Sequence, residues 1–167
     1  LELLLSKADI TPADRKVVSA ANRISEETGA PAAAIELADG TVLTGKTKNL
    51  LGAASALVLN ALKHLAKIDD RLELIPSDLI EPVQSLKVNY LGSRNPRLHV
   101  DEILVALSVA AATNKNAAKA LSFLPMLKGA QVHCTVILSS PDRKIFSKLG
   151  VDLTTEPDYE NDNLYHI

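Results

Sequence analysis

The stretch AAAIELADGTVLTGKT, residues 32–47, decides the fold of this chain. It contains two short apolar runs on either side of Asp39 and Gly40, and the second run is rich in β-branched residues. An Asp-Gly pair between two such runs is a strong signal for a β-hairpin, because both residues tolerate the left-handed backbone that a tight turn needs. The sequence therefore predicts two antiparallel strands.

The same stretch matches a nucleotide-binding pattern. Residues 40–47, GTVLTGKT, fit G-x-x-x-x-G-K-[ST], the P-loop in which backbone amides cradle a phosphate. The spacer TVLT is typical of a strand, and the later apolar strand QVHCTVIL, residues 131–138, lacks the carboxylate that would hold Mg²⁺. We therefore predict a hairpin, with a true P-loop as the alternative. Lys46 remains a candidate anion-binding residue at the end of its strand.

Helical patterns lie on both sides of this hairpin. A helix is predicted over residues 12–28, with Thr11 as its N-cap and Gly29 as its left-handed stop. After the hairpin, Asn49 is expected to cap the helix LLGAASALVLNALKHLAK, residues 50–67, whose alanines and leucines surround it on nearly every side. Such a helix is expected to be buried against the sheet.

The rest of the chain predicts a helical block and then a strand-helix-strand unit. In the block, residues 77–128, Pro82 predicts a kink or a restart because it removes a backbone donor. The final unit comprises residues 131–138, 141–149 and 151–155, and it predicts a parallel pair of strands. The fold class that follows is α/β, a three-layer α/β/α sandwich with a mixed sheet.

The domain organisation follows from the same pattern. We expect an N-terminal helical segment over residues 1–30, continuing from a missing upstream domain, because the chain opens LELLLSKADITPADR without an initiator Met. Residues 31–157 are expected to form the α/β domain, with the helical block inserted, and residues 158–167 an acidic tail.

Composition excludes several classes of function. Across 167 residues, 18 basic and 20 acidic side chains give a formal charge of −2, so no bulk positive field attracts nucleic acid or an anionic membrane. The chain has one cysteine, which makes neither an internal disulfide nor a multi-thiolate metal site and fits a reducing cytoplasm. No long apolar run indicates a membrane span.

The hairpin, the buried helix and the strand-helix-strand unit together resemble the cytidine-deaminase-like fold. Enzymes of that family carry H-x-E or C-x-E at the start of the helix after the hairpin, and P-C-x-x-C at the start of the next one. Here the first position is NLLGAASAL, and a single cysteine excludes the second motif. The resemblance therefore implies the architecture without zinc chemistry, and no metal site is predicted.

Three longer motifs carry a closer resemblance that covers most of the chain. They are PAAAIELADGTVLTGKT (31–47), LIEPVQSLKVNYLGSRNPRLHVDEILVALS (79–108) and LKGAQVHCTVILSSPDRKIFSKLGVDLTTEP (127–157). They resemble the C-terminal part of an uncharacterised bacterial family catalogued as domain of unknown function 1846. The resemblance implies a cytoplasmic protein of greater length, and it supplies no activity and no cofactor.

The polar loop GSRNPRLHVDE, residues 92–102, is the main candidate binding site, because it opens into a helix N-terminus. Guanidinium groups beside free helix amides suit a phosphate or a carboxylate. The candidate ligand-binding residues are Lys46, Ser93, Arg94, Asn95 and Arg97. The alternative is structural: Asn95 and Pro96 form a turn, and the acids at the helix start satisfy its dipole while the arginines are solvated or pair with those acids.

His133 and His99 are the candidate catalytic residues. His133 lies inside an apolar strand, where a histidine is commonly a hydrogen-bonded core residue, yet histidine is also the side chain that titrates near neutrality. If His99 lies near His133, the two form a candidate acid-base pair or metal site. Cys134 is predicted to be a buried apolar filler.

Two functions fit these observations. In the first, the domain binds a small phosphorylated or nucleotide-like anion through the basic loop, with or without catalysis. In the second, it is a non-catalytic structural or oligomerisation domain of a longer multidomain protein, and it contacts an upstream domain and further copies of itself. The sequence leaves the reaction and the cofactor open.

Overall fold

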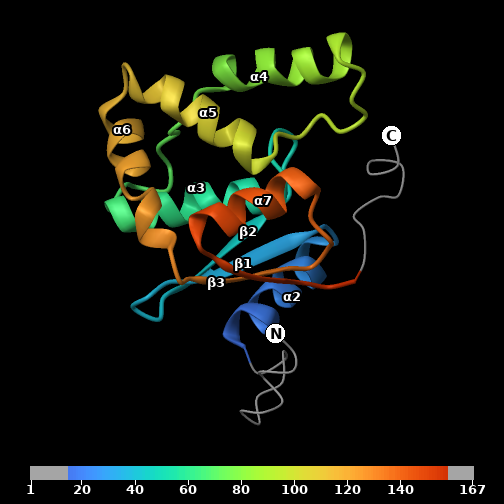
Figure 1. The fold of residues 1–167 in the computed structure, drawn as a ribbon, viewed down its shortest axis with the longest axis vertical. Helices are drawn as coiled ribbons and strands as arrows, with labels where there is room; N and C mark the ends of the chain where they lie inside the picture. The colour runs from blue at the N-terminus through green and yellow to red at the C-terminus, as the bar shows by residue number, and fades with distance from the viewer. Residues whose placement is uncertain (1–14, 158–167) are drawn as a thin grey trace.

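The structure is a computed structural model that describes residues 15–157. Four strands form one mixed sheet in the order β2-β1-β3-β4, in which β1 is antiparallel to both β2 and β3, and β3 is parallel to β4 (Figure 1). Their bounds are β1 Ala32–Glu36, β2 Val42–Lys46, β3 Gln131–Cys134 and β4 Asp152–Thr155. The predicted α/β class, the hairpin and the parallel strand pair are confirmed. The likeness to cytidine deaminases stays a prediction.

The hairpin turn lies at Asp39 and Gly40. Gly40 has a φ of 86°, and the amide of Leu37 donates a hydrogen bond of 2.9 Å to the carbonyl of Thr41. Asp39 Oδ1 accepts the amide of Thr41 at 2.9 Å, which closes the turn from the side chain. The GKT sequence therefore lies at the end of a paired strand, and the P-loop alternative is wrong.

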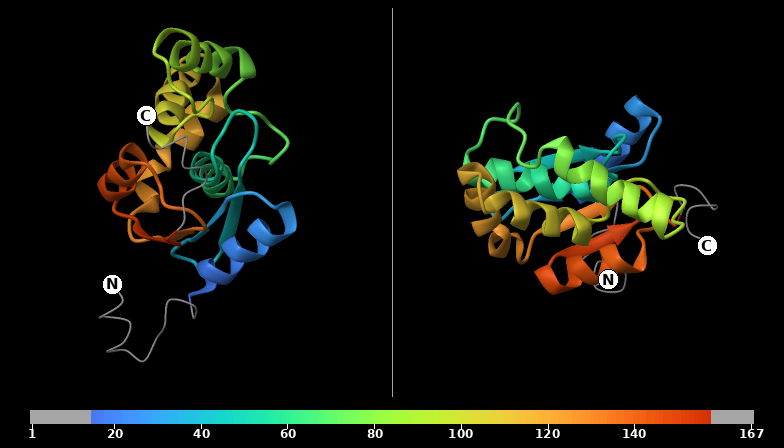
Figure 2. Two further views of the ribbon diagram at one scale, coloured as in Figure 1. Left: turned by 90° about the vertical axis from the view of Figure 1, so that its right-hand side faces the viewer. Right: turned by 90° about the horizontal axis from the view of Figure 1, so that it is seen from above.

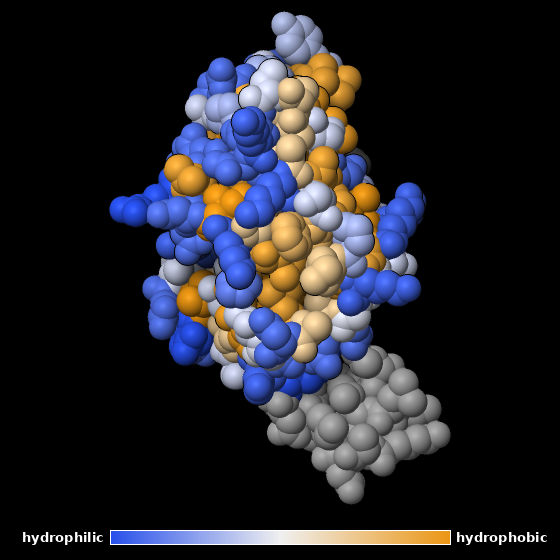
Figure 3. All heavy atoms as spheres, turned by 90° about the vertical axis from the view of Figure 1, so that its left-hand side faces the viewer, coloured by the Kyte–Doolittle hydropathy of each residue, from blue (hydrophilic) through white to orange (hydrophobic). Residues whose placement is uncertain are grey.

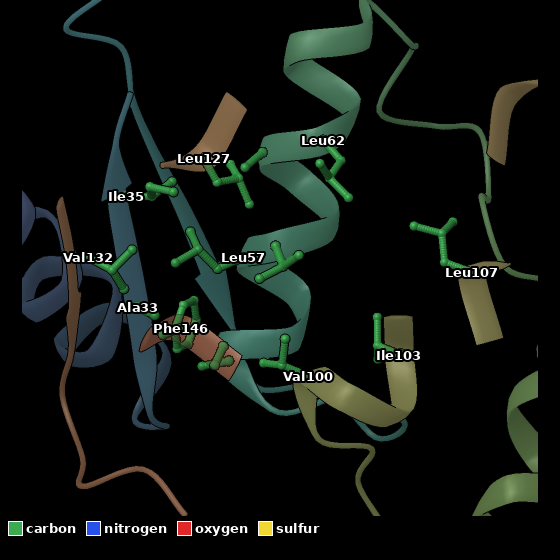
Figure 4. Close-up of a cluster of buried hydrophobic side chains, with 14 of the residues drawn as sticks. Ala33, Ile35, Leu57, Leu62, Val100, Ile103, Leu107, Leu127, Val132 and Phe146 are labelled. Carbon is green, nitrogen blue, oxygen red and sulfur yellow. The ribbon is translucent and has the colours of Figure 1, made fainter. Parts of the chain in front are cut away.

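Helices cover both faces of the sheet (Figure 2). Helix α2, Lys16–Thr28, packs on one face, where Val17, Ala21 and Ala34 form a small apolar cluster, and it ends at Gly29 with φ 68°. The other face carries α3, Ala53–Ala66, and α7, Ser140–Leu149. The large core lies there (Figure 4), and its members include Ala33, Ile35, Leu57, Leu62, Val132 and Phe146.

Helix α3 lies unusually close to strand β2 at Gly45. A Cβ atom added to Gly45 would lie 2.5 Å from the amide nitrogen of Leu57 and 2.8 Å from the carbonyl oxygen of Ala53. Asn60 of the same helix donates from Nδ2 to the carbonyl of Thr44 at 2.9 Å. The glycine of the GKT sequence thus makes room for a helix backbone.

The helical block lies on the far side of α3 from the sheet (Figure 1). Pro82 neither breaks nor restarts its first helix, because the chain continues through it into a π-helical turn and the amide of Leu86 bonds to the carbonyl of Pro82. The elements are α4 Ser77–Ser85, η2 Leu86–Tyr90, α5 Val100–Ala111, α6 Lys115–Ser122 and the 3-10 turn η3 Leu124–Leu127. None of the helices between residues 15 and 157 is long and apolar enough to cross a bilayer.

Two predicted helix starts are wrong. Helix α2 begins at Lys16, because Arg15 is extended with ψ 131°, and the predicted N-cap Thr11 lies outside the described residues. Helix α3 begins after Gly52 and not at Asn49. Leu51 instead pairs with Leu98 in an isolated parallel bridge, and this tertiary pairing holds the chain before Gly52 out of the helix.

Strand β3 is also shorter than predicted. It ends at Cys134, where residues up to 138 were expected to continue it. Its two neighbours stop at the same level, since Ala33 of β1 and Thr155 of β4 both pair with Cys134. The chain therefore leaves the sheet there and leads toward the start of α7.

Candidate functional site

Three helix N-termini meet beyond the carboxyl end of β3. They belong to α3, α5 and α7, and they surround a small cavity of about 30 Å³. Crevices at the carboxyl ends of strands in open α/β sheets are the usual place for ligands. Gly52, Ala53, Ala54 and Ser55 line the cavity from the start of α3, and Asn95, Arg97 and His99 line it from the loop before α5. The lining also includes Cys134 at the end of β3, Leu138 in the loop that follows, and Asp142 in α7.

The N-terminus of α3 enters this cavity without a capping side chain among the described residues. Its N-cap is Gly52, in an extended conformation with φ −70° and ψ 165°. Ala54 and Ser55 are buried, with 4% and 1% of their surfaces exposed. Because the first amides of a helix have no partner within the helix, this end presents hydrogen-bond donors and a partial positive charge to the cavity.

Asp142 of α7 joins the starts of α5 and α7. Its Oδ1 accepts the amide of Val100 at 2.8 Å, and its Oδ2 lies 3.4 Å from Nδ1 of His99. The hydrogen bond from Asp142 raises the pKa of His99, against the opposing effect of burial. The pair therefore places a histidine with enhanced proton affinity on the cavity wall.

A buried ion pair fixes the backbone beside His99. Lys87 is only 8% exposed, and its Nζ lies 2.9 Å from Glu102 Oε1 and 2.6 Å from the carbonyl oxygen of Arg97. Glu102 Oε1 also accepts the amide of His99 at 2.8 Å. Charge-assisted hydrogen bonds of this kind are stronger than neutral ones, so the segment 97–99 is held firmly at the cavity.

Of the predicted ligand-binding residues, Asn95 and Arg97 line this cavity and the others do not. Arg97 Nε donates to the carbonyl of Lys48 at 2.9 Å, and the Arg97 amide donates to Asn95 Oδ1 at 3.1 Å. Arg94 and Lys46 are exposed, and Ser93 is half-buried with its hydroxyl bonded to the backbone of Asn95. The predicted set is thus split between the cavity wall and the outer surface.

His133 lies on the opposite face of the sheet, so the structure does not bring it together with His99. It pairs with Ala34, which packs on α2, while its neighbour Cys134 lines the cavity. Its Nδ1 lies 2.7 Å from Thr154 Oγ1, and its Nε2 lies 3.2 Å from Glu156 Oε1. Burial lowers the pKa of His133, against the opposing effect of Glu156.

The structure gives His99 a different partner, Asp142, which sequence analysis did not single out. Asp142 follows Pro141 at a helix start, a position where an acidic side chain normally indicates only a favourable dipole interaction. Within residues 15–157, no three His, Cys, Asp or Glu side chains gather as a metal-binding group. Cys134 is buried as predicted, and burial raises the pKa of its thiol.

Comparison with known proteins places the chain in a family. Residues 13–165 match the family described as "Domain of unknown function DUF1846, C-terminal". A UPF0371 protein (cu0538) of Corynebacterium urealyticum is 53% identical over 163 residues, which are 98% of this chain and 33% of that protein. The UPF0371 protein str1377 of Streptococcus thermophilus is 47% identical over 165 residues, which are 99% of this chain and 33% of that protein.

The chain therefore spans about a third of the length of these curated relatives, which are longer proteins. The match to the family covers all of the described residues, including every residue that lines the cavity. The chain belongs to the family described as domain of unknown function DUF1846, C-terminal.

Proposed function

We propose that this chain is a ligand-binding domain, and that its cavity receives the anionic end of a small phosphorylated or nucleotide-like molecule. The observation that carries the proposal is the buried, uncapped N-terminus of α3, which lines the cavity together with Arg97 and His99. Helix N-termini are anion-binding sites, because their amides point outward and the helix dipole favours negative charge.

The size of the cavity limits what enters it. A volume of about 30 Å³ holds roughly one water-sized group. One terminal oxygen of a phosphate or carboxylate would therefore occupy the cavity, and the rest of the ligand would lie outside it, along the loop of residues 92–97. The exposed guanidinium of Arg94 on that loop suits a second contact with such a ligand.

His99 is the proposed acid-base group at this site. Its raised pKa favours the protonated imidazole, which stabilises an anion and has a proton to donate. Asp142 positions the ring, since its carboxylate lies beside Nδ1 and is itself fixed by the amide of Val100. His133, on the other face of the sheet, has no part in this site.

The test fills the cavity with a carboxylate supplied by the protein. Gly52 is extended, and no atom lies within 4 Å of a Cβ added there, so Gly52→Asp fits and caps α3. A thermal-shift and calorimetric screen of inorganic phosphate, adenine nucleotides and sugar phosphates should find a compound that stabilises the wild type. Gly52→Asp should weaken the binding of that compound at least tenfold. The same substitution should raise the free energy of unfolding of the unliganded domain by about a few tenths of a kcal/mol.

Gly52→Ala is the matched control, because it adds a side chain of similar position without an acceptor or a charge. It should retain binding of the same compound. Equal binding by wild type and Gly52→Asp, or failure of every phosphorylated compound to stabilise the intact longer protein, would contradict the proposal.

A second function has its own support. Figure 3 shows apolar residues gathered on one face between hydrophilic ones. Val105 and Val109 lie one turn apart on α5, with 64% and 55% of their surfaces exposed. Tyr90, the last residue of η2, and Leu91, which follows it, are 80% and 71% exposed. Large exposed apolar side chains are common in interaction sites. A structural domain that contacts other copies of itself, or the rest of a longer protein, accounts for them.

A further inference from the structure

A second and much larger cavity lies on the other side of the segment 48–51. It has a volume of about 360 Å³ and lies between α3, that segment, residues 73–75 and the first turn of α4. This volume falls in the range of small-molecule sites, which is about 300–1,000 Å³. The cavity shares no lining residue with the small cavity beside His99.

The wall of this large cavity is apolar where it is deepest. Ala56, Leu74 and Ile80 are 3%, 2% and 5% exposed, and Leu50, Leu51 and Leu59 are half-buried around them. Side chains that are buried from three separate segments form a preformed apolar surface, which favours the apolar body of a ligand.

The charged residues of the lining are two lysines and one glutamate. Lys63 is half-buried on α3, and its Nζ donates to the carbonyl of Asp70 at 3.0 Å, while Lys48 and Glu73 are exposed at the rim. Among the lining side chains, two positive charges and one negative charge leave a net charge of +1. Asp69 and Asp70 do not line the cavity but also act on Lys63, so the positive charge that faces the cavity comes from the two lysines alone.

The charges that act on Lys63 come from the lining and from outside it. Burial lowers the pKa of Lys63, and the positive charge of Lys48 lowers it further, whereas Asp70, Glu73 and Asp69 act in the opposite direction. Lys48 and Lys63 line the same cavity, and their like charges repel each other. An anion placed between them relieves that repulsion and the cost of burying the ammonium group.

We propose that the large cavity binds a small monocarboxylate with an apolar body, whose carboxylate lies between Lys48 and Lys63 and whose body packs on Leu74 and Ile80. This site is separate from the phosphate-binding function proposed above, and it does not depend on it. Asn60 fixes the geometry of the wall, since its side-chain amide is bonded to the carbonyl of Thr44 and holds α3 on the hairpin.

The experiment compares three probes on the intact ¹⁵N-labelled protein by NMR titration. Octanoate carries both the charge and the chain, octanol carries the chain alone, and acetate carries the charge alone. Octanoate should give saturable shifts at the amides of Lys63, Leu74 and Ile75. Octanol should bind at least tenfold more weakly, and acetate should give no saturable shift.

Matched variants locate the carboxylate. Lys63→Met keeps the aliphatic stem without the charge and should weaken octanoate binding at least tenfold. Lys48→Met, on the exposed rim, should weaken octanoate binding by the same factor. It tests the site independently, because it leaves the contact between Lys63 and Asp70 in place. Lys67→Met is the control, because Lys67 is exposed at the end of the same helix and does not line the cavity. It should bind octanoate as the wild type does.

The outcomes separate the two proposed sites. Gly52→Asp should leave octanoate binding unchanged, so failure of the phosphate site does not affect this test. The proposal is overturned if octanoate does not bind, if octanol binds as tightly as octanoate, or if both Lys63→Met and Lys48→Met retain full affinity.

Discussion

Gly45 shows how one residue in a functional motif can serve packing instead. In the GKT sequence the glycine would be expected to approach a phosphate, but here its missing side chain lets the backbone of α3 approach β2. Gly45 lies within strand β2, opposite Ala33 in the hairpin register. The requirement for glycine comes from a neighbouring helix and not from the local conformation.

Gly45→Ala should therefore be strongly destabilising. The added methyl group would lie 2.5 to 2.8 Å from three backbone atoms of α3, and backbone atoms cannot move aside as a flexible side chain can. Overpacking of this kind costs about 1–3 kcal/mol, and we expect the upper end of that range. Urea denaturation measures the change in the free energy of unfolding.

Gly52→Ala serves as the control for this substitution too, since nothing lies within 4 Å of its added Cβ. It should cost no more than about 1 kcal/mol, the usual effect of alanine at a helix N-cap. Equal stability of the Gly45→Ala and wild-type proteins would show that α3 does not pack on β2 as described.

The sequence predicted a strand over TVLTG, residues 41–45, from its β-branched residues, and it favoured this strand over the phosphate loop. It could not show why Gly45 is a glycine, because the clash involves Leu57, twelve positions further along. The same limit applies to Asp142, whose partners His99 and Val100 lie about forty residues earlier. Contacts at such separations depend on the complete fold.

At the scale of elements, the junction of α5 and α7 should make stability depend on pH. The pKa of His99 is raised above its usual value of 6.5, so its protonated form is stabilised in the folded protein. This contribution is fully present below about pH 6.5 and is lost as the pH rises through the folded pKa. His99→Gln should therefore differ most from the wild type in acid and least at high pH.

His133, in the strand β3, supplies the internal comparison because its shift has the opposite sign. Its folded pKa lies below 6.5, so its contribution is present above that pH and is lost as the pH falls through the folded value. Urea denaturation of the wild type, His99→Gln and His133→Gln between about pH 5 and pH 9 measures how the free energy of unfolding depends on pH for each histidine. Parallel pH profiles for the two variants would refute the assignment of partners.

Two asparagines show what sequence reveals about helix ends. Asn114 precedes α6, and its side chain accepts the amides of Asn116 and Ala117 at 2.9 and 3.2 Å, as an N-cap does. Asn49 has the same local preference but is not the N-cap of α3, which is Gly52. The bridge between Leu51 and Leu98 keeps the residues after Asn49 out of the helix. A cap is predictable from sequence only where no tertiary pairing competes for the same backbone.

At the scale of the whole molecule, the exposed side of α5 is the clearest candidate for a surface that contacts another protein. If the domain associates through it, Val105→Lys with Val109→Lys should convert a dimer or larger assembly into a monomer, measured by light scattering after gel filtration. Both side chains are exposed, so the fold should tolerate the change. Leu72→Lys, which changes an exposed apolar residue on a loop, is the control and should leave the mass unchanged.

The result has two informative alternatives. A wild-type protein that is monomeric at every concentration would reject self-association through α5. Loss of the assembly in the Leu72→Lys control as well would place the contact elsewhere. The relatives' greater length makes the intact longer protein the proper sample, since this chain covers 33% of them.

The hairpin, the parallel strand pair and the layers could be predicted from sequence, because hydrophobic periodicity and turn residues indicate which segments are strands and which are helices. The order of the strands in the sheet was not predicted. The cavity beside His99 could not, because it forms where three helix starts separated along the chain converge. Sequence analysis identified its loop, residues 92–102, from the density of polar groups, and missed the contribution of α3 because glycine and alanine carry no chemical signal.

Cys134 gives the core a built-in reporter. It is the chain's single cysteine, it is 1% exposed at the carboxyl end of β3, and burial favours its unreactive thiol form. A thiol-modifying reagent would therefore reach it only when β3 separates from the helices above it. The rate of modification counts these openings directly in the unaltered protein, and a ligand that closes the neighbouring cavity would slow it without any added label.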